Sequence, residues 1–376
     1  METFKFICTP EIVLGNGSLS SLGEKIKKFH GTRVFVVMDK TLSDVKNEVK
    51  KTLDKEKISY FIYDEIVSEP TTDSGNHAGR LAKEEKCDIV CGIGGGSSMD
   101  TAKAVSILIT NDGKVEDYQG MEKVPKPGVP KIMVPTTAGT GSEVTFTAVF
   151  IREKEKTKGG INSKYLYPEC AILDPGLTVS LPQGPTAFTG IDAFCHAIES
   201  YISKKSNFFT EAISEKAMEL IWENLPIVYN KPGDIKARSN MLYGSFLAGI
   251  GLVNAGVTAV HSLSYPLGGL FGIAHGTGNA LLLPYVLKAE ISEIKNKLSK
   301  TGTKITGRKC GAESFIHELK KFEKGLKIPE KLSELSIPQN TIEQIAEGAM
   351  KIAVPLENNP RTFTKQDIIK IYQKAY

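Results

Sequence analysis

The periodicity of hydrophobic residues changes once along the 376-residue chain, near Asp174-Pro175. Before that point, short β-branched runs such as Val34–Met38 and Asp88–Ile93 alternate with helical patterns, which predicts βαβ units and a parallel sheet. After it, the period-two runs disappear, and from Thr186 onward the pattern is helical with prolines between the segments. We therefore expect an α/β N-terminal domain, residues 1–178, and an all-α C-terminal domain, residues 179–376, each large enough for its own core.

Three more strands complete the expected N-terminal half, at Lys131–Val134, Thr145–Ile151 and Ala171–Leu173. Residues 291–325 behave differently, because they are rich in Lys, Thr and Gly and show the weakest pattern in the chain. We expect this region to be a mobile part of the surface.

Charge and composition exclude several classes of protein. The formal net charge of +4 is small for this length, which disfavours a nucleic-acid partner. No apolar run reaches the length that spans a membrane. The six cysteines are scattered without a CxxC motif, and we find no signal peptide, so we expect a reducing cytoplasmic environment.

A run of small residues, Gly94–Ser98, lies between a predicted strand and a predicted helix. Amide groups at a helix N-terminus attract phosphate, and glycines let a ligand approach the backbone closely. Ser97 can cap the helix or bind a phosphate oxygen. The spacing is not that of the G-x-G-x-x-G fingerprint, so a tight turn without a ligand stays open as the alternative.

A second small-residue loop, which contains Thr136 and Thr137, follows the strand at Lys131–Val134. Loops at the carboxyl ends of parallel strands flank the crevice where open α/β sheets bind ligands, although a cluster of Ser/Thr turns would look the same. Asp39 ends an earlier strand, where an acid binds the ribose 2′-hydroxyl of NAD and repels the 2′-phosphate of NADP. Capping of the following segment explains Asp39 equally well.

The candidate metal ligands are an Asp and three His. Asp192 and His196 are four residues apart and therefore share one face of a helix, for which Thr189-Gly190 is the expected start. His261 and His275 lie in Gly-rich apolar segments. A carboxylate with imidazoles suits a divalent transition metal acting as a Lewis acid. The alternative is that His196 is a hydrogen-bonded core histidine and Asp192 a charge that favours the helix dipole.

Glu199 lies three residues after His196, on the same predicted helix face. Such a carboxylate can support a metal ligand from behind. It can equally be an ordinary charge on the surface or at an interface.

Five segments together resemble the iron-containing (group III) alcohol dehydrogenase family, and the resemblance covers nearly the whole chain. They are Gly94–Lys103, Pro135–Thr145, Leu181–Ser200, Asn254–Ala280 and Asn359–Arg361. The resemblance implies a dehydroquinate-synthase-like fold, with a dinucleotide-binding α/β domain and an all-helical domain that binds metal and substrate. It also implies interconversion of small primary alcohols or diols with their aldehydes, and a homodimer or larger assembly.

The resemblance assigns roles to individual residues. The family's metal ligands, which hold Fe²⁺ or Zn²⁺, fall on Asp192, His196, His261 and His275. Its contacts to NAD(H) or NADP(H) fall on Asp39, Gly95, Gly96, Ser97, Thr136, Thr137 and Lys158.

This sequence departs from the family pattern at two positions near the implied site. Glu69 stands where many members have Asn, and Tyr265 stands where several members have a His near the nicotinamide. Tyr265 or a chain of water molecules could therefore accept the proton. Two other enzyme classes compete on this fold. The fourth ligand, His196, disfavours a glycerol-type polyol dehydrogenase with three zinc ligands, and the apolar segments around the ligands disfavour a dehydroquinate-synthase-like lyase.

Overall fold

The computed structural model describes residues 3–66, 69–153, 155 and 157–376. The chain forms two compact units, which divide between Ser180 and Leu181, and residues 3–7 belong to the second unit. We expected these residues in the first unit. They group with the helices because the Asn254 side chain accepts the N–H of Ile7 at 2.6 Å and donates to its carbonyl at 2.9 Å. Hydrophobic periodicity cannot reveal such a contact between distant residues.

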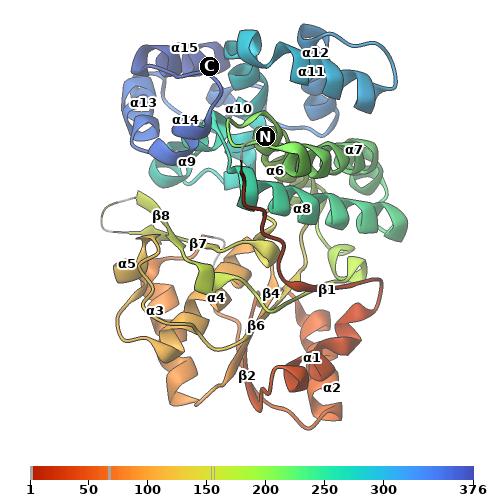
Figure 1. Ribbon diagram of the computed structural model, residues 1–376, viewed down its shortest axis with the longest axis vertical. Coiled ribbons are helices and arrows are strands. Elements are labelled where there is room, and N and C mark those ends of the chain that lie inside the picture. Colours follow the sequence, from red (N-terminus) through yellow and green to blue (C-terminus); the bar gives the residue numbers. More distant parts are fainter. Residues whose placement is uncertain (1–2, 67–68, 154, 156) are drawn as a thin grey trace. The chain divides into compact units, whose positions relative to one another are not determined.

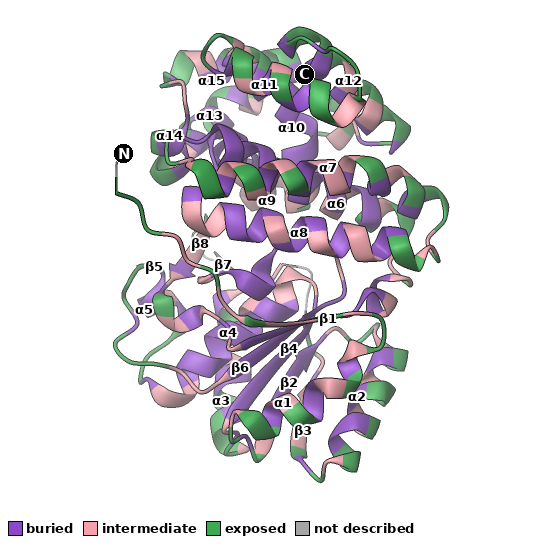
Figure 2. Cartoon of the chain, turned by 45° about the vertical axis from the view of Figure 1, so that its right-hand side comes forward, coloured by how far each residue is buried: buried purple, intermediate pink, exposed green. Residues whose placement is uncertain are grey.

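The first unit contains a six-stranded sheet in the order β1-β9-β6-β4-β2-β3, and all its paired strands are parallel. The strands are β1 (Glu11–Leu14), β2 (Arg33–Met38), β3 (Ser59–Tyr63), β4 (Ile89–Gly94), β6 (Lys131–Pro135) and β9 (Cys170–Leu173). The central strands β2, β4 and β6 are buried almost throughout, as Figure 2 shows. Burial on both faces explains why they appear as continuous hydrophobic runs.

Helices cover both faces of this sheet (Figure 1). Val34, Val36 and Met38 of β2 point into a core shared with α1 (Leu22–Lys28) and α2 (Ser43–Lys55). The alternate residues Phe35 and Val37 point into a second core, shared with α3 (Thr72–Glu84) and α4 (Gly96–Thr110). The unit is therefore doubly wound, and its parallel sheet agrees with the βαβ units that the alternation of strands and helices predicted.

The strand order reverses between β2 and β4. The chain runs outward from β2 to the edge strand β3 and then crosses back to β4 on the other side of β2. Ligands of doubly wound sheets bind at this reversal, outside the carboxyl ends of the strands. The two ends that meet here lead into Asp39 and Gly95.

A smaller sheet in the same unit has the order β5-β8-β7. It consists of β5 (Gly120–Met121), β7 (Thr147–Arg152) and β8 (Thr157–Asn162), and β7 and β8 are antiparallel. The short helix α5 (Val115–Tyr118) contributes Val115 and Tyr118 to the core beside it.

The second unit is helical in its described residues (Figure 1). Its helices are α6 (Gln183–Ile202), α7 (Phe208–Asn230), α8 (Ile235–Ala255), α9 (Ala259–Phe271), α10 (His275–Ala289), α11 (Ile291–Thr306), α12 (Ala312–Gly325), α13 (Ile342–Met350), α14 (Ala353–Asn358) and α15 (Lys365–Ala375). Helix α6 packs against α7, α8 and α10 and is buried almost completely from Gly190 onward.

The predicted start of α6 at Thr189-Gly190 is wrong, because the helix begins at Gln183, after Pro182. Gly190 serves packing instead. A Cβ atom at this position would come within 2.5 Å of the Leu225 side chain on α7. Thr189 turns its hydroxyl back to the carbonyl of Pro185, a bond within the helix. Both residues resemble start signals because small and hydroxylated residues serve helix packing as well as helix ends.

Residues 291–325 are also more regular than predicted, because they form α11 and α12. The buried face of α11 carries Ile294, Leu298 and Thr301 at helical spacing, and Gly302 is buried beside them. A Cβ atom on Gly302 would lie 2.8 Å from the Cβ of Phe315 on α12. Because Thr and Gly occupy some of the core-facing positions of α11, its apolar face cannot be recognised from the pattern of hydrophobic residues.

Among the described residues, no single helix is long and apolar enough to cross a membrane. Helices α8 and α9 pass that test only together, by length and composition, and a bend of 105° separates them. Most of the apolar side chains on both helices are buried within the helical unit.

A buried carboxyl group follows the end of α10. Glu290 is completely buried, and its Oε2 accepts a 2.6 Å hydrogen bond from the Asn359 amide. Its Oε1 has no hydrogen-bond partner. Burial raises the pKa of Glu290 from 4.5 to about 8.

This shift predicts a pH-dependent contribution to stability. Because the folded-state pKa is raised, the stabilising contribution of the protonated group is complete below pH 4.5 and is lost as the pH rises to about 8. In Glu290→Gln the side-chain oxygen can still accept a hydrogen bond from Asn359, but the side chain at this position no longer titrates. We expect the free energy of unfolding of the wild type, relative to that of Glu290→Gln, to fall by up to about 1.4 kcal/mol per pH unit between pH 5 and 8.

Urea denaturation across this range measures the difference, with Glu343→Gln at an exposed position of α13 as the control. Parallel pH profiles for the wild type and Glu290→Gln would show that Glu290 does not titrate differently in the folded protein.

Candidate metal centre and cofactor loops

Four side chains from three helices converge in the helical unit. Asp192 and His196 lie one turn apart on α6, His261 is the third residue of α9, and His275 is the first residue of α10. Each offers one ligand atom, and these four atoms all lie within 4.8 Å of one another. The helix carrying the predicted pair therefore meets the beginnings of two other helices, each of which brings one histidine.

The surroundings of this cluster are largely dry. Asp192, His196 and His261 are only 2–5% exposed. The ring centroid of His261 lies 4.7 Å from that of His196 and 5.1 Å from that of His275. Nε2 of His275 lies 3.9 Å from Oδ1 of Asp192. One carboxylate oxygen with three imidazole nitrogens fits a divalent transition metal better than Ca²⁺ or Mg²⁺.

The charges within the cluster shift each other's pKa. Burial alone would raise the pKa of Asp192, but His196, His275 and His261 outweigh this effect and lower it. Burial alone would lower the pKa of His261, whereas the Glu199 carboxylate raises it overall. The carboxylate of Asp192 therefore stays ionised inside the helical unit, as a metal ligand must.

Asn279 lies among the four ligand groups, and the sequence analysis missed it. Its Nδ2 donates to Asp192 Oδ1 at 2.7 Å and lies 3.1 Å from Nε2 of both His261 and His275. Its Oδ1 is buried without a hydrogen-bond partner. Asn279 stands four residues after His275, which is the same spacing as from Asp192 to His196. This spacing places both side chains on one helix face and could have identified Asn279 from the sequence.

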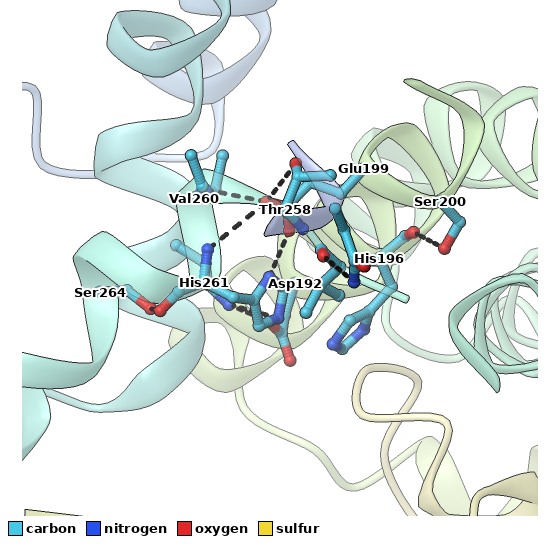
Figure 3. Close-up of polar contacts among 12 residues, drawn as sticks. Asp192, His196, Glu199, Ser200, Thr258, Val260, His261 and Ser264 are labelled. Carbon is cyan, nitrogen blue, oxygen red and sulfur yellow. Dashed lines mark hydrogen bonds and ion pairs between the residues drawn. The ribbon is translucent and has the colours of Figure 1, made fainter. Parts of the chain in front are cut away.

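Glu199 is completely buried and belongs to the surroundings of the ligands. Figure 3 shows its carboxylate bonded to the segment that begins α9, and one oxygen contacts His261 Nδ1. Of the two interpretations of Glu199, a surface charge is therefore excluded by its burial.

Tyr265 lies on α9, one turn after His261. Its ring centroid is 5.4 Å from that of His275 and 6.4 Å from that of His261. The side chain is half-buried. It therefore borders the ligand cluster without being one of its four donors.

The α/β unit brings the predicted glycine and threonine loops together. Helix α4 begins at Gly96, earlier than the sequence indicated, so Gly95 is its N-cap residue and Ser97 its second residue. The N–H of Thr136 donates to the carbonyl of Gly94 at 2.9 Å. Since β4 and β6 are neighbouring strands, the loops that follow them lie side by side at the same edge.

Gly96 is needed for this approach, because a Cβ atom on it would lie 2.8 Å from the methyl group of Thr140. A Cβ atom on Gly95 would lie at an ordinary contact distance, 3.6 Å from Thr137. Gly95 and Gly96 carry no side chain, so the amide groups at the N-terminus of α4 are accessible to a ligand, as a phosphate-binding site requires.

A buried lysine on α4 fixes the second loop. Lys103 Nζ donates to Ser142 Oγ at 2.7 Å, Thr145 Oγ1 at 2.9 Å and the Thr147 carbonyl at 2.9 Å. Asp100, three residues earlier, accepts from Ser142 Oγ at 2.6 Å. Burial lowers the pKa of Lys103 to about 8. The sequence analysis included Lys103 only as the last residue of the segment Gly94–Lys103 and assigned it no role.

Asp39 and Lys158 already have partners within the α/β unit. Oδ1 of Asp39 accepts from the N–H of Thr41 at 2.8 Å and from its hydroxyl at 2.7 Å. These bonds hold the turn before α2, whereas the N-cap of α2 itself is Leu42. Lys158, on β8, forms an ion pair of 2.6 Å with Glu69. Glu69, one of the departures from the family pattern, is thus the partner of a residue assigned to the cofactor.

Comparisons with known proteins agree over the whole chain. Residues 9–175 match the family model of iron-containing alcohol dehydrogenases, and residues 186–376 match the C-terminal model of the Fe-containing alcohol dehydrogenase family. The chain is 36% identical to long-chain-alcohol dehydrogenase 1 of Geobacillus thermodenitrificans, over 100% of this chain and 98% of that protein. It is 34% identical to the NAD-dependent methanol dehydrogenase of Bacillus methanolicus, over 98% and 99%.

The structure supports the same relationship. A crystal structure of 1,3-propanediol oxidoreductase superimposes with a TM-score of 0.96 and 31% identity, over 100% of both chains. The doubly wound α/β unit, the helical unit and both family models agree with the resemblance seen in the sequence. This chain therefore belongs to the iron-containing alcohol dehydrogenase family of oxidoreductases.

Proposed function

We propose that this protein is a metal-dependent, NAD-linked alcohol dehydrogenase and aldehyde reductase, whose metal ligands are Asp192, His196, His261 and His275. The observation that carries the proposal is the convergence of these four donor atoms within 4.8 Å. The family name favours Fe²⁺ as the metal, and the donor set also suits Zn²⁺.

The bound metal would supply Lewis acidity, which lowers the pKa of an alcohol hydroxyl and polarises an aldehyde carbonyl. The protein contributes a dry, preorganised set of donors. Asp192 supplies the one negative charge among the four, and the histidines remain neutral ligands that do not cancel the charge of the ion. The nearly complete burial of Asp192 and His261 keeps water away and strengthens electrostatic interactions there.

The cofactor contacts that we propose lie on the α/β unit. The pyrophosphate would bind at the N-terminus of α4, where Gly95, Gly96 and Ser97 expose amide groups. Thr136 and Thr137 border this site from the neighbouring loop, and Asp39 would receive the adenosine ribose across the reversal of strand order. Lys158 would contribute positive charge, reduced by its pairing with Glu69.

The names of the relatives support small alcohols as substrates, since they include methanol, long-chain alcohols and 1,3-propanediol. We propose a small primary alcohol or diol, or the corresponding aldehyde, as the substrate class. We further propose a homodimer or larger assembly from the family resemblance. A reducing cytoplasmic location is supported by the six free cysteines.

We propose Tyr265 as the group that moves the hydroxyl proton. Its half-buried ring lies beside His275 and His261, and its hydroxyl can both donate and accept. A chain of water molecules is the competing route.

The first test removes one ligand. His261→Ala should reduce bound metal from about one ion to less than a tenth per chain and abolish turnover, because it removes one of the four proposed donor atoms. Protein stripped of metal is reconstituted with Fe²⁺ or Zn²⁺ under anaerobic conditions, and NADH oxidation by butyraldehyde and metal content are measured together. His317→Ala, at an exposed position of α12, is the matched control. Full turnover of the His261→Ala variant would overturn the ligand assignment.

The second test concerns the choice of cofactor. Asp39→Asn keeps an Oδ1 that accepts both bonds from Thr41 but removes the negative charge. We expect the ratio of kcat/KM for NADPH over NADH to rise about tenfold or more, because the repulsion of a 2′-phosphate is lost. An unchanged ratio, with the fold intact by circular dichroism, would show that Asp39 only caps its turn.

The third test concerns the proton. Tyr265→Phe should lower kcat/KM about 100-fold and alter its pH profile, with the metal content unchanged, because a positioned acid–base group is lost. Tyr285→Phe, which removes a hydroxyl bonded to the carbonyl of Glu330, is the control. Wild-type kcat/KM in Tyr265→Phe would assign the proton to water instead.

A further inference from the structure

The start of α9 is stabilised by side chains distant in the sequence. Glu199 Oε1 accepts from the N–H of Thr258 at 3.1 Å, of Val260 at 2.8 Å and of His261 at 3.4 Å. It also accepts from the Thr258 hydroxyl at 2.8 Å. The helix itself cannot satisfy these N–H groups, so one buried carboxylate oxygen acts as the N-cap of a helix on which it does not lie.

The remaining N–H at this helix start has a different partner. Ala259 donates to Asn359 Oδ1 at 3.0 Å. The amide of Asn359 is held in turn, because its Nδ2 donates to Glu290 Oε2 at 2.6 Å and to the carbonyl of Arg361 at 2.7 Å. Asn359 thus caps the helix without touching the ligands.

The second oxygen of Glu199 faces a ring nitrogen. Oε2 forms a short contact with His261 Nδ1, as Figure 3 shows. Because an ionised carboxylate can only accept, the proton of this bond belongs to Nδ1. At the other side of the ring, Nε2 lies 3.1 Å from the amide nitrogen of Asn279, which is a donor. An acceptor faces Nδ1 and a donor faces Nε2, so both neighbours select the same tautomer.

We propose that Glu199 is a positioning residue that fixes the tautomer and the ring orientation of His261, so that the lone pair of Nε2 is directed into the ligand cluster. The proposal rests on the metal-binding function proposed above. The carboxylate performs two tasks at once: Oε1 holds the backbone at the start of α9, and Oε2 holds the side chain of its third residue. The position of His261 is therefore set through both its main chain and its ring.

A charged group is required for this arrangement. Glu199 is completely buried, and a buried carboxylate is costly unless several donors satisfy it. Here three N–H groups, one hydroxyl and one imidazole N–H surround it, and the positive end of the α9 dipole adds to their effect. A glutamine of the same shape could satisfy only one of the two sides, because its amide nitrogen is a donor.

The test uses Glu199→Gln and a matched control. The control is Thr258→Val, which keeps the branched shape but removes one of the bonds to Oε1 and leaves the contact with His261 intact. Co²⁺ affinity of the full-length protein is measured by competition with a chelator and by the absorption spectrum of bound Co²⁺. We expect the dissociation constant to rise about 10- to 100-fold in Glu199→Gln. In Thr258→Val it should change by less than about threefold.

A second measurement reads the tautomer of His261 directly and includes the metal-free wild type. The ¹⁵N spectrum of ring-labelled wild-type protein reports which nitrogen of His261 carries the proton. We expect Nδ1–H in the metal-free wild type, Nδ1–H with Nε2 as the ligand in the Zn²⁺-loaded protein, and a shift toward Nε2–H in metal-free Glu199→Gln.

These outcomes separate the two proposals. If the wild type binds no metal, the proposed function fails, and the ring tautomer in metal-free protein still tests Glu199. Ligation through Nδ1 would overturn the positioning role. Equal Co²⁺ affinity in the wild type and Glu199→Gln, within about threefold, would overturn it as well.

Discussion

Burial of charged and polar groups is the constraint on which the helical unit depends. A carboxylate removed from water must be surrounded by donors or lose its charge, and the unit contains both solutions. Asp192 stays ionised beside three imidazoles, whereas Glu290, with one amide partner, has its pKa raised to about 8. Glu199 is surrounded by five donors, all of them from the segment Thr258–His261. The positions of α6, α9 and α10 are therefore coupled by polar bonds as well as by apolar packing.

In the α/β unit, the equivalent role falls to Lys103. Its ammonium is bound by three oxygens from the segment Ser142–Thr147, and this segment follows the threonine loop. Because Lys103 lies on α4, the helix that begins with the glycine loop also fixes the loop after β6. The reversal of strand order places these loops at one edge of the sheet, and the buried lysine holds their spacing. Sheet topology decides where a ligand can bind, and the polar core decides how precisely the binding groups are placed.

The sequence was sufficient for local features of both units. The spacing of Asp192 and His196 indicated one helix face, and the alternation of strands and helices indicated βαβ units and a parallel sheet. Features that depend on tertiary contacts could not be predicted from the sequence. Gly190 resembled a helix start because nothing local reveals that Leu225 packs against it. The stripe of α11 was hidden by Gly302, and Glu199 was ambiguous because its partners lie about 60 residues later in the chain.

The departures from the family pattern fall around the ligand set and not on it. Tyr265 borders two of the histidines, and in the proposed function its hydroxyl would act on the route of the proton without adding a donor to the four that converge. Glu69 pairs with Lys158 and so partly neutralises the positive charge of a residue that is proposed to contact the cofactor. In the proposed cofactor site, the backbone amides at the start of α4 would then carry a larger share of phosphate binding. Neither departure therefore alters the convergence of the four donor atoms of Asp192, His196, His261 and His275, so the candidate metal site depends on α6, α9 and α10 alone.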